Sequence, residues 1–65
     1  MTIDEQIAWV SEKAAKLLRF AQDADEDGYT NRADRGREEA ATLTTIENSL
    51  RRLKALAEQA SGEVV

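Results

Sequence analysis

The stretch DADEDGYTNRADRGR, residues 23–37, is the only part of the chain where the regular spacing of apolar residues fails. It contains two of the three glycines, Gly28 and Gly36, and the single tyrosine, Tyr29. Glycine commonly occupies the left-handed position just past the end of a helix. We therefore predict that a helix ends near Asp27 and that this stretch is the hinge of a helical hairpin.

Upstream of the hinge, apolar residues recur in alternating steps of four and three. Such spacing keeps one stripe of a helix facing a partner helix. Thr2 and Glu5 have the spacing of a capping box, so a first helix is expected over about residues 3–26. Its predicted stripe consists of Ile3, Ile7, Val10, Ala14, Leu17, Ala21 and Ala24.

Downstream of the hinge, a second helix is expected over about residues 32–60, after a turn over about residues 27–31. Thr30 or Asn31 has the side chain of an N-cap. The stripe of this helix is thin near the hinge, where Gly36 and alanines would let the two helices approach closely. The predicted stripe consists of Ala33, Ala40, Leu43, Ile46, Leu50, Leu53, Ala57 and Ala60.

Residues 1–65 are therefore expected to form one domain, an all-α antiparallel two-helix hairpin, with residues 63–65 frayed. A chain this short buries a modest fraction of its surface. Trp9, Leu18 and Phe20 lie off the stripe of the first helix and would be exposed in a single hairpin. Large apolar residues beside a helix stripe indicate a second packing surface. We expect the hairpins to assemble into a helical-bundle homo-oligomer, between a dimer and a hexamer.

Composition excludes several classes of function. The chain has no Cys and no His, which rules out disulfides and zinc sites built from these residues. A net charge of −4 argues against DNA as a partner. No apolar run approaches the roughly eighteen residues of a membrane span, and a signal-peptide pattern is absent, so we expect a cytoplasmic protein that binds no membrane. Without His, Cys or a phosphate-binding glycine loop, we predict no catalytic residue, cofactor or metal site and no enzyme.

A calcium site is the alternative for the hinge. Residues 23–34 place acids at loop positions 1, 3, 5 and 12 and glycine at position 6, as in an EF-hand. Asp34, at position 12, is shorter than the usual glutamate, and the first helix requires Ala24 within it. We therefore favour an acidic hinge neutralised by the arginines that follow, over an EF-hand-like loop. These arginines are Arg32, Arg35 and Arg37.

On the first helix, Trp9, Lys13 and Lys16 follow one another in steps of four and three, which places them on one face. An aromatic ring beside ammonium groups suits a nucleobase and its phosphate. The same spacing also fits an interface tryptophan beside solvated lysines. On spacing alone, we favour this second interpretation.

Short motifs in both helices resemble a family of phage proteins. Arg37-Glu38, Leu43-Thr44 and Ile46-Glu47 have the spacing of the Arg-Glu, Leu-Thr and Leu-Glu pairs of that family. Residues 12–18, EKAAKLL, resemble its first helix, which is rich in Lys, Ala and Leu. The family is the helical-hairpin sponges, which include the anti-CBASS protein that sequesters cyclic oligonucleotides and its anti-Thoeris relatives.

The resemblance implies a non-enzymatic protein that forms multimers, typically hexamers, and traps a cyclic nucleotide immune signal between protomers. It would act in the host cytoplasm if phage-encoded. By this resemblance Lys13 would contact phosphate, with Lys16 as its alternative. In the family, the aromatic residue that stacks on the base lies in an arm before the hairpin. Trp9 is therefore not a residue-by-residue match, and it is our own choice for the base-stacking residue. Arg37 and Thr44 match the motif and are expected to line a second site.

The alternative function is a small helical interaction or inhibitor module that docks on a larger host or phage protein, for which an exposed apolar strip would serve. The chain also departs from the family at residues 50–54, LRRLK, where the family has small and aromatic residues. This difference leaves the oligomer number open.

Overall fold

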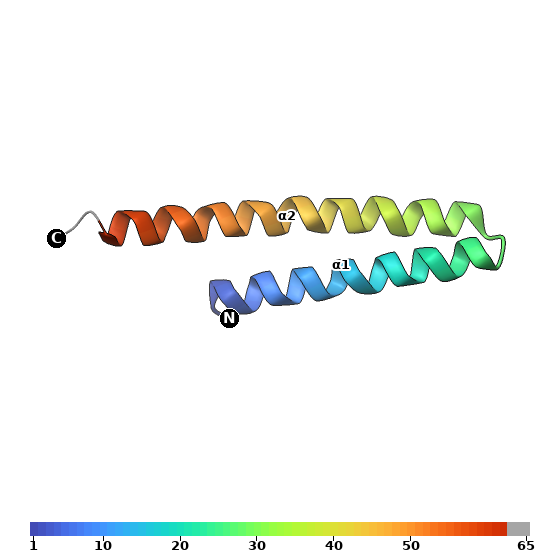
Figure 1. Ribbon diagram of the computed structural model, residues 1–65, viewed down its shortest axis with the longest axis horizontal. Coiled ribbons are helices and arrows are strands. Elements are labelled where there is room, and N and C mark those ends of the chain that lie inside the picture. Colours follow the sequence, from blue (N-terminus) through green and yellow to red (C-terminus); the bar gives the residue numbers. More distant parts are fainter. Residues whose placement is uncertain (63–65) are drawn as a thin grey trace.

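The computed structural model describes residues 1–62, so the expected fraying of residues 63–65 lies outside the described part of the chain. Two helices, α1 (Ile3–Glu26) and α2 (Thr30–Gly62), run antiparallel and side by side (Figure 1). The molecule is a rod 57 Å long and 16 by 14 Å across. This is the all-α hairpin that the sequence predicts.

The first turn of α1 is capped by its predicted residues. The Thr2 hydroxyl accepts a hydrogen bond from the Glu5 backbone N–H at 3.2 Å and donates one to the Glu5 carboxylate at 3.1 Å. The Glu5 carboxylate thus accepts a hydrogen bond from the side-chain hydroxyl of Thr2, whereas in a standard capping box it accepts one from the backbone N–H of the capping residue. Asp4 and Glu5 also place negative charge at the positive end of the helix dipole.

The chain leaves α1 through a turn that depends on glycine. Gly28 has φ of +86°, as predicted for a left-handed residue. The Gly28 N–H donates to the Asp25 carbonyl at 3.1 Å, and the Tyr29 N–H donates to the Ala24 carbonyl at 2.8 Å. These two bonds form a Schellman motif, which satisfies carbonyls that the helix end leaves free.

The start of α2 differs from the prediction. The helix begins at Thr30, and Tyr29 stands in the capping position, where its carbonyl accepts from the Ala33 N–H at 3.1 Å. Thr30 and Asn31 therefore lie inside the first helical turn and do not cap it. The turn is shorter than predicted, residues 27–29, because the Schellman motif reverses the chain so quickly.

The stripe of α1 that faces α2 is the predicted one. Ile7, Val10 and the alanines of the stripe are buried, and Ile3 and Leu17 are half-buried. The steps of four and three therefore identified the packing face of this helix correctly.

The stripe of α2 that faces α1 is not the predicted one. Ile46 and Leu53 are 43% and 57% exposed, while their neighbours Glu47 and Lys54 are half-buried. The exposed members of the predicted stripe are Ile46, Leu53, Ala57 and Ala60. The stripe that packs on α1 runs through Ala33, Gly36, Ala40, Leu43, Glu47, Leu50 and Lys54.

Close packing near the turn explains this rotation of α2. Gly36 is buried, and a Cβ there would lie 3.3 Å from both the Ala21 Cβ and the Leu17 carbonyl oxygen. Ala21, Ala24 and Ala33 form the buried cluster of this region. Small residues let the two backbones approach here. The same stripe continues along α2 in steps of four and three. It therefore brings two half-buried charged residues of α2 toward α1 and leaves the apolar residues beside them exposed.

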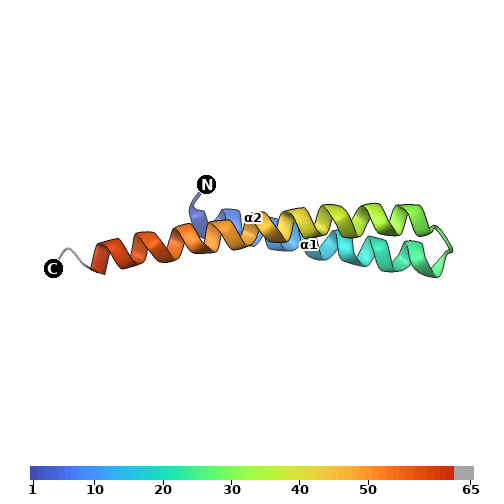
Figure 2. The same cartoon turned by 90° about the horizontal axis from the view of Figure 1, so that it is seen from above.

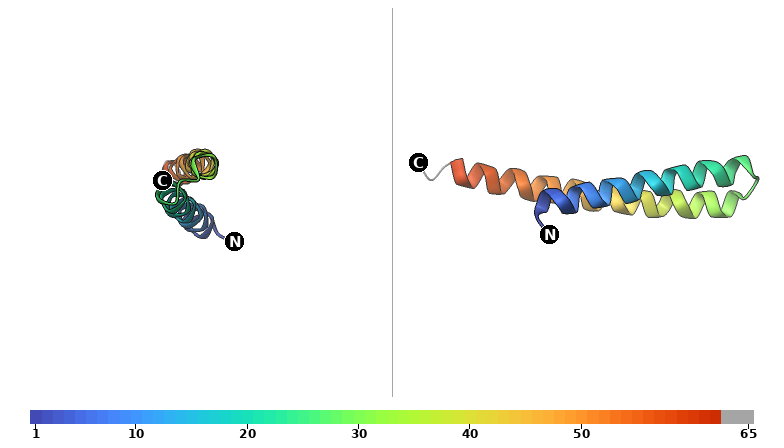
Figure 3. Two further views of the ribbon diagram at one scale, coloured as in Figure 1. Left: turned by 90° about the vertical axis from the view of Figure 1, so that its right-hand side faces the viewer. Right: turned by 90° about the horizontal axis from the view of Figure 1, so that it is seen from below.

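At the open end of the hairpin, α2 projects past the start of α1 (Figure 2). The Lys54 ammonium pairs with the Asp4 carboxylate at 2.6 Å and joins the two helices there. Seen end-on, the helices cross rather than run strictly parallel (Figure 3). Within residues 1–62, neither helix has the length of apolar sequence needed to cross a membrane.

Candidate functional site

The hairpin leaves most of its large apolar side chains in solvent, whereas its buried residues are mainly alanines. Trp9, Leu18 and Phe20 are 49%, 52% and 52% exposed, which confirms the expectation that one hairpin cannot cover them. Tyr29 and, on α2, Ile46, Leu53 and Leu56 are also exposed.

One side of the hairpin carries residues that stand one position before a buried or half-buried stripe residue. In an antiparallel helix pair, such residues from both helices lie on the same flank of the seam. For example, Trp9 precedes Val10 on α1, and Leu53 precedes Lys54 on α2. We call this side the Trp9 flank. Its members with large apolar or charged side chains are Trp9, Lys13, Lys16, Phe20 and Asp23 from α1, and Arg32, Arg35, Glu39, Ile46 and Leu53 from α2.

The predicted trio on α1 stands on this flank. The Lys13 ammonium lies 5.4 Å from the centroid of the Trp9 ring, within the range of a cation–π contact. Lys16 pairs with Glu12, four residues earlier on the same helix, at 3.6 Å. Trp9 and Lys13 are therefore in contact, while the charge of Lys16 is partly engaged by a neighbour on its own helix.

At the turn end of the same flank, Phe20 borders an open hollow of about 300 Å³, which we call the Phe20 hollow. Its presence confirms that Phe20 of α1 and the arginines of α2 share one flank. Among the described residues, neither Arg32 nor Arg35 lies within 4.0 Å of a carboxylate. The hollow is lined by Leu17, Phe20, Arg32, Arg35, Gly36 and Glu39.

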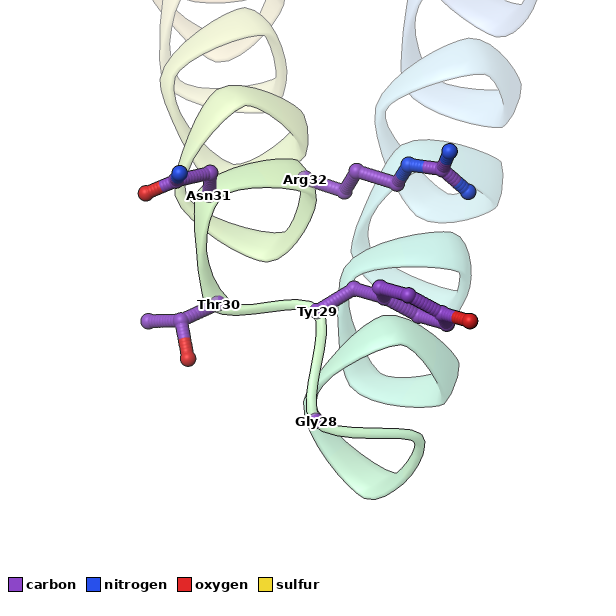
Figure 4. A pocket seen from close by; sticks show the side chains of 5 residues that line it. All are labelled: Gly28, Tyr29, Thr30, Asn31 and Arg32. Carbon is purple, nitrogen blue, oxygen red and sulfur yellow. The ribbon is translucent and has the colours of Figure 1, made fainter.

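A second hollow, of about 450 Å³, lies at the turn itself. The Arg32 guanidinium stands 4.9 Å from the centroid of the Tyr29 ring. Figure 4 shows these two side chains extending to the same side of the turn, while Thr30 and Asn31 point to the other. Arg32 lines both hollows, so the basic and aromatic groups at this end of the rod are continuous.

Arg37 and Thr44 do not join this flank. Each stands one position after a buried or half-buried stripe residue and therefore lies on the opposite side of the seam. Arg37 pairs there with Asp25 across the two helices and with Asp34 at 3.6 Å on its own helix. The structure thus separates the predicted binding residues into two groups on opposite flanks.

The acidic hinge does not form the loop of an EF-hand. Residues 23–26 are the last turn of α1, and residues 30–34 already belong to α2. Over the chain that the structure describes, no group of three or more acidic side chains is placed to hold a metal ion. Of the three arginines expected to neutralise the hinge acids, only Arg37 does so among the residues that the structure describes.

Two basic residues of the segment 50–54 of α2, Arg51 and Lys54, are held in ion pairs. Arg51 pairs with Glu47, four residues earlier on the same helix, at 2.9 Å. The hydrogen bond to the Asp4 carboxylate, together with the negative charge of that group, raises the pKa of Lys54 above its ordinary value of 10.5. These contacts fit a solvated, ion-paired surface better than a phosphate site.

Comparison of the chain with known protein families, with characterised proteins and with solved structures found no match. The geometry of the Trp9 flank is therefore what defines the candidate site. Reasoning from the sequence missed the part of the site at the turn. Its signal was present, because Phe20 extends the Trp9, Lys13, Lys16 spacing by one further step of four.

Proposed function

We propose that this chain is a non-enzymatic cytoplasmic protein whose hairpins self-associate and hold a cyclic nucleotide signal between protomers, as in the phage sponges that its motifs resemble. The observation that carries the proposal is the contact between the Lys13 ammonium and the half-exposed Trp9 ring. An exposed indole offers a stacking surface for a base, and an adjacent ammonium group offers a partner for phosphate.

The apolar side chains of the Trp9 flank support self-association. A standard interface buries about 800 Å² on each partner, which is about a sixth of the 5128 Å² surface of the hairpin. One face of a rod 57 Å long and 16 Å wide measures roughly 900 Å². Two hairpins packed side by side would therefore have sufficient contact area. They would cover Ile46 and Leu53, which a single hairpin exposes.

A thermal-shift panel of cyclic dinucleotides, cyclic trinucleotides and cyclic ADP-ribose isomers tests the proposal. A ligand at 100 times its dissociation constant adds about 2.7 kcal/mol to the free energy of unfolding, which is a plain increase in melting temperature. The matched variants are Lys13→Gln and Arg19→Gln, because each removes one exposed positive charge from α1. We expect a ligand to stabilise the wild type and Arg19→Gln, but Lys13→Gln much less. No increase with any panel member would refute the proposal.

The second candidate is an interaction module that docks on a larger protein. Its supporting observation is the apolar surface of α2, where Leu53 and Leu56 are 57% and 54% exposed. Analytical ultracentrifugation separates the two candidates. A folded monomer at micromolar concentration that binds no nucleotide would favour the module, whereas a ligand-stabilised oligomer would favour the sponge.

A further inference from the structure

The Phe20 hollow gathers positive charge that the rest of this acidic chain does not neutralise. The net charge is −4, and Lys16, Arg37, Arg51 and Lys54 each pair with a carboxylate. The two arginines of the hollow have no such partner among the described residues, although acids are abundant around the turn. Arg32 and Arg35, three residues apart on α2, are neighbours on one face of the helix, and a guanidinium group pairs strongly with phosphate.

The same hollow offers an aromatic surface. Phe20 is 52% exposed beside Gly36. A Cβ on residue 36 would lie 3.5 Å from the Phe20 Cδ1 atom, so the glycine keeps the space beside the ring open. An exposed ring next to guanidinium groups suits a flat ligand that carries negative charge.

The volume of the hollow and its third charged residue, Glu39, limit the kind of ligand that it can bind. The volume of about 300 Å³ is at the lower limit for small-molecule sites, so the ligand has the size of a single nucleotide. Glu39 lines the hollow, and its carboxylate accepts hydrogen bonds. It repels free phosphate and suits an amino or hydroxyl group on the ring. We infer that the Phe20 hollow binds a nucleoside monophosphate, with the phosphate on Arg32 and Arg35 and the base on Phe20.

This position is separate from the Trp9 and Lys13 contact. Trp9 and Phe20 stand eleven residues apart on α1, which corresponds to about 16 Å along the helix axis. A single nucleotide does not reach from one ring to the other. The inference is therefore independent of the proposed function, and the two can fail separately.

Nuclear magnetic resonance of the ¹⁵N-labelled protein tests the inference with two built-in reporters. The Gly36 amide lies in the hollow, and the indole N–H of Trp9, the only tryptophan, reports the other position. AMP is the probe, with adenosine and inorganic phosphate as separate arms. We expect AMP to shift the Gly36 signal saturably, with a lower apparent Kd than adenosine or inorganic phosphate. Arg35→Gln should raise the apparent Kd about tenfold, and Arg19→Gln should leave it unchanged.

Phe20→Leu tests the contribution of the aromatic ring to binding separately from that of the arginines. It should reduce the preference for AMP over inorganic phosphate while the arginines still bind the phosphate. Unchanged circular dichroism spectra confirm that each variant folds. A Gly36 signal that AMP does not move, or equal losses of affinity in Arg35→Gln and Arg19→Gln, would overturn the inference. An AMP response at the Trp9 indole alone would also overturn it and would support the proposed function. A response at Gly36 alone would support the inference.

Discussion

From the close contact of Gly36 with α1, we predict how a larger residue at this position changes the free energy of unfolding. In Gly36→Ala, the added Cβ would lie 3.3 Å from the Ala21 Cβ and from the Leu17 carbonyl oxygen. Neither atom belongs to a flexible side-chain end, because one is attached directly to the backbone and the other is part of it. The two helices would therefore have to separate by a few tenths of an ångström at their closest approach.

Two effects of opposite sign decide the outcome. Replacing glycine by alanine inside a helix gains about 1 kcal/mol from helix propensity. Overpacking a close contact costs about 1–3 kcal/mol. We expect the steric cost to exceed the gain, so that Gly36→Ala lowers the free energy of unfolding by about 1 kcal/mol. For a chain of this size, that change lowers the melting temperature by about 4–8 °C.

Urea denaturation at one fixed protein concentration measures this change, because self-association would make stability depend on concentration. Ala41→Gly is the propensity control, since residue 41 is an exposed position of the same helix. Combining Gly36→Ala with Ala21→Gly removes the closest side-chain contact. The two changes should cost less together than the sum of their separate effects.

Stabilisation of Gly36→Ala by the full propensity gain of about 1 kcal/mol would refute this account. It would show that the two helices do not approach closely at this position. The rotation of α2 would then need a different explanation.

Three further predictions concern the turn, the cap and the open end. Gly28→Ala should destabilise the protein by about 1–2 kcal/mol, because φ is +86° and no neighbouring atom lies within 4 Å to add a steric cost; a neutral result in urea denaturation would contradict this. Thr2→Ala should cost about 1 kcal/mol through loss of the hydrogen bond to the Glu5 N–H, and unchanged thermal melts would exclude that role. Because the Asp4 contact raises the pKa of Lys54 in the folded state, its stabilisation is complete below pH 10.5 and is lost as the pH rises through the folded-state pKa. Wild-type stability should therefore fall more steeply than that of Asp4→Asn above pH 10.5, and parallel curves of urea midpoint against pH would contradict it.

The predicted part of the candidate site is the part that lies on one helix. Trp9 and Lys13 are four residues apart, so helical geometry alone places them together. The Phe20 hollow needs α1 and α2 in their packed arrangement, and therefore sequence spacing did not assemble it. Arg37 and Thr44 were predicted only because they match the second-helix motif of the family that the chain resembles. Packing separates them, because they stand on the opposite side of the stripe.

The sequence by itself determined the extent and stripe of α1, the left-handed turn at Gly28 and the hairpin fold. These features depend on hydrogen bonds and side chains only a few residues apart, so local chemistry specifies them. Only the tertiary structure decided which stripe of α2 meets α1. The sequence offers two stripes that share Leu43 and Leu50 but differ by one residue at positions 46–47 and 53–54. The more apolar one includes Ile46 and Leu53. The close approach at Gly36 selected the other, because a helix packs as one rigid rod and its tightest contact sets the rotation of all its side chains.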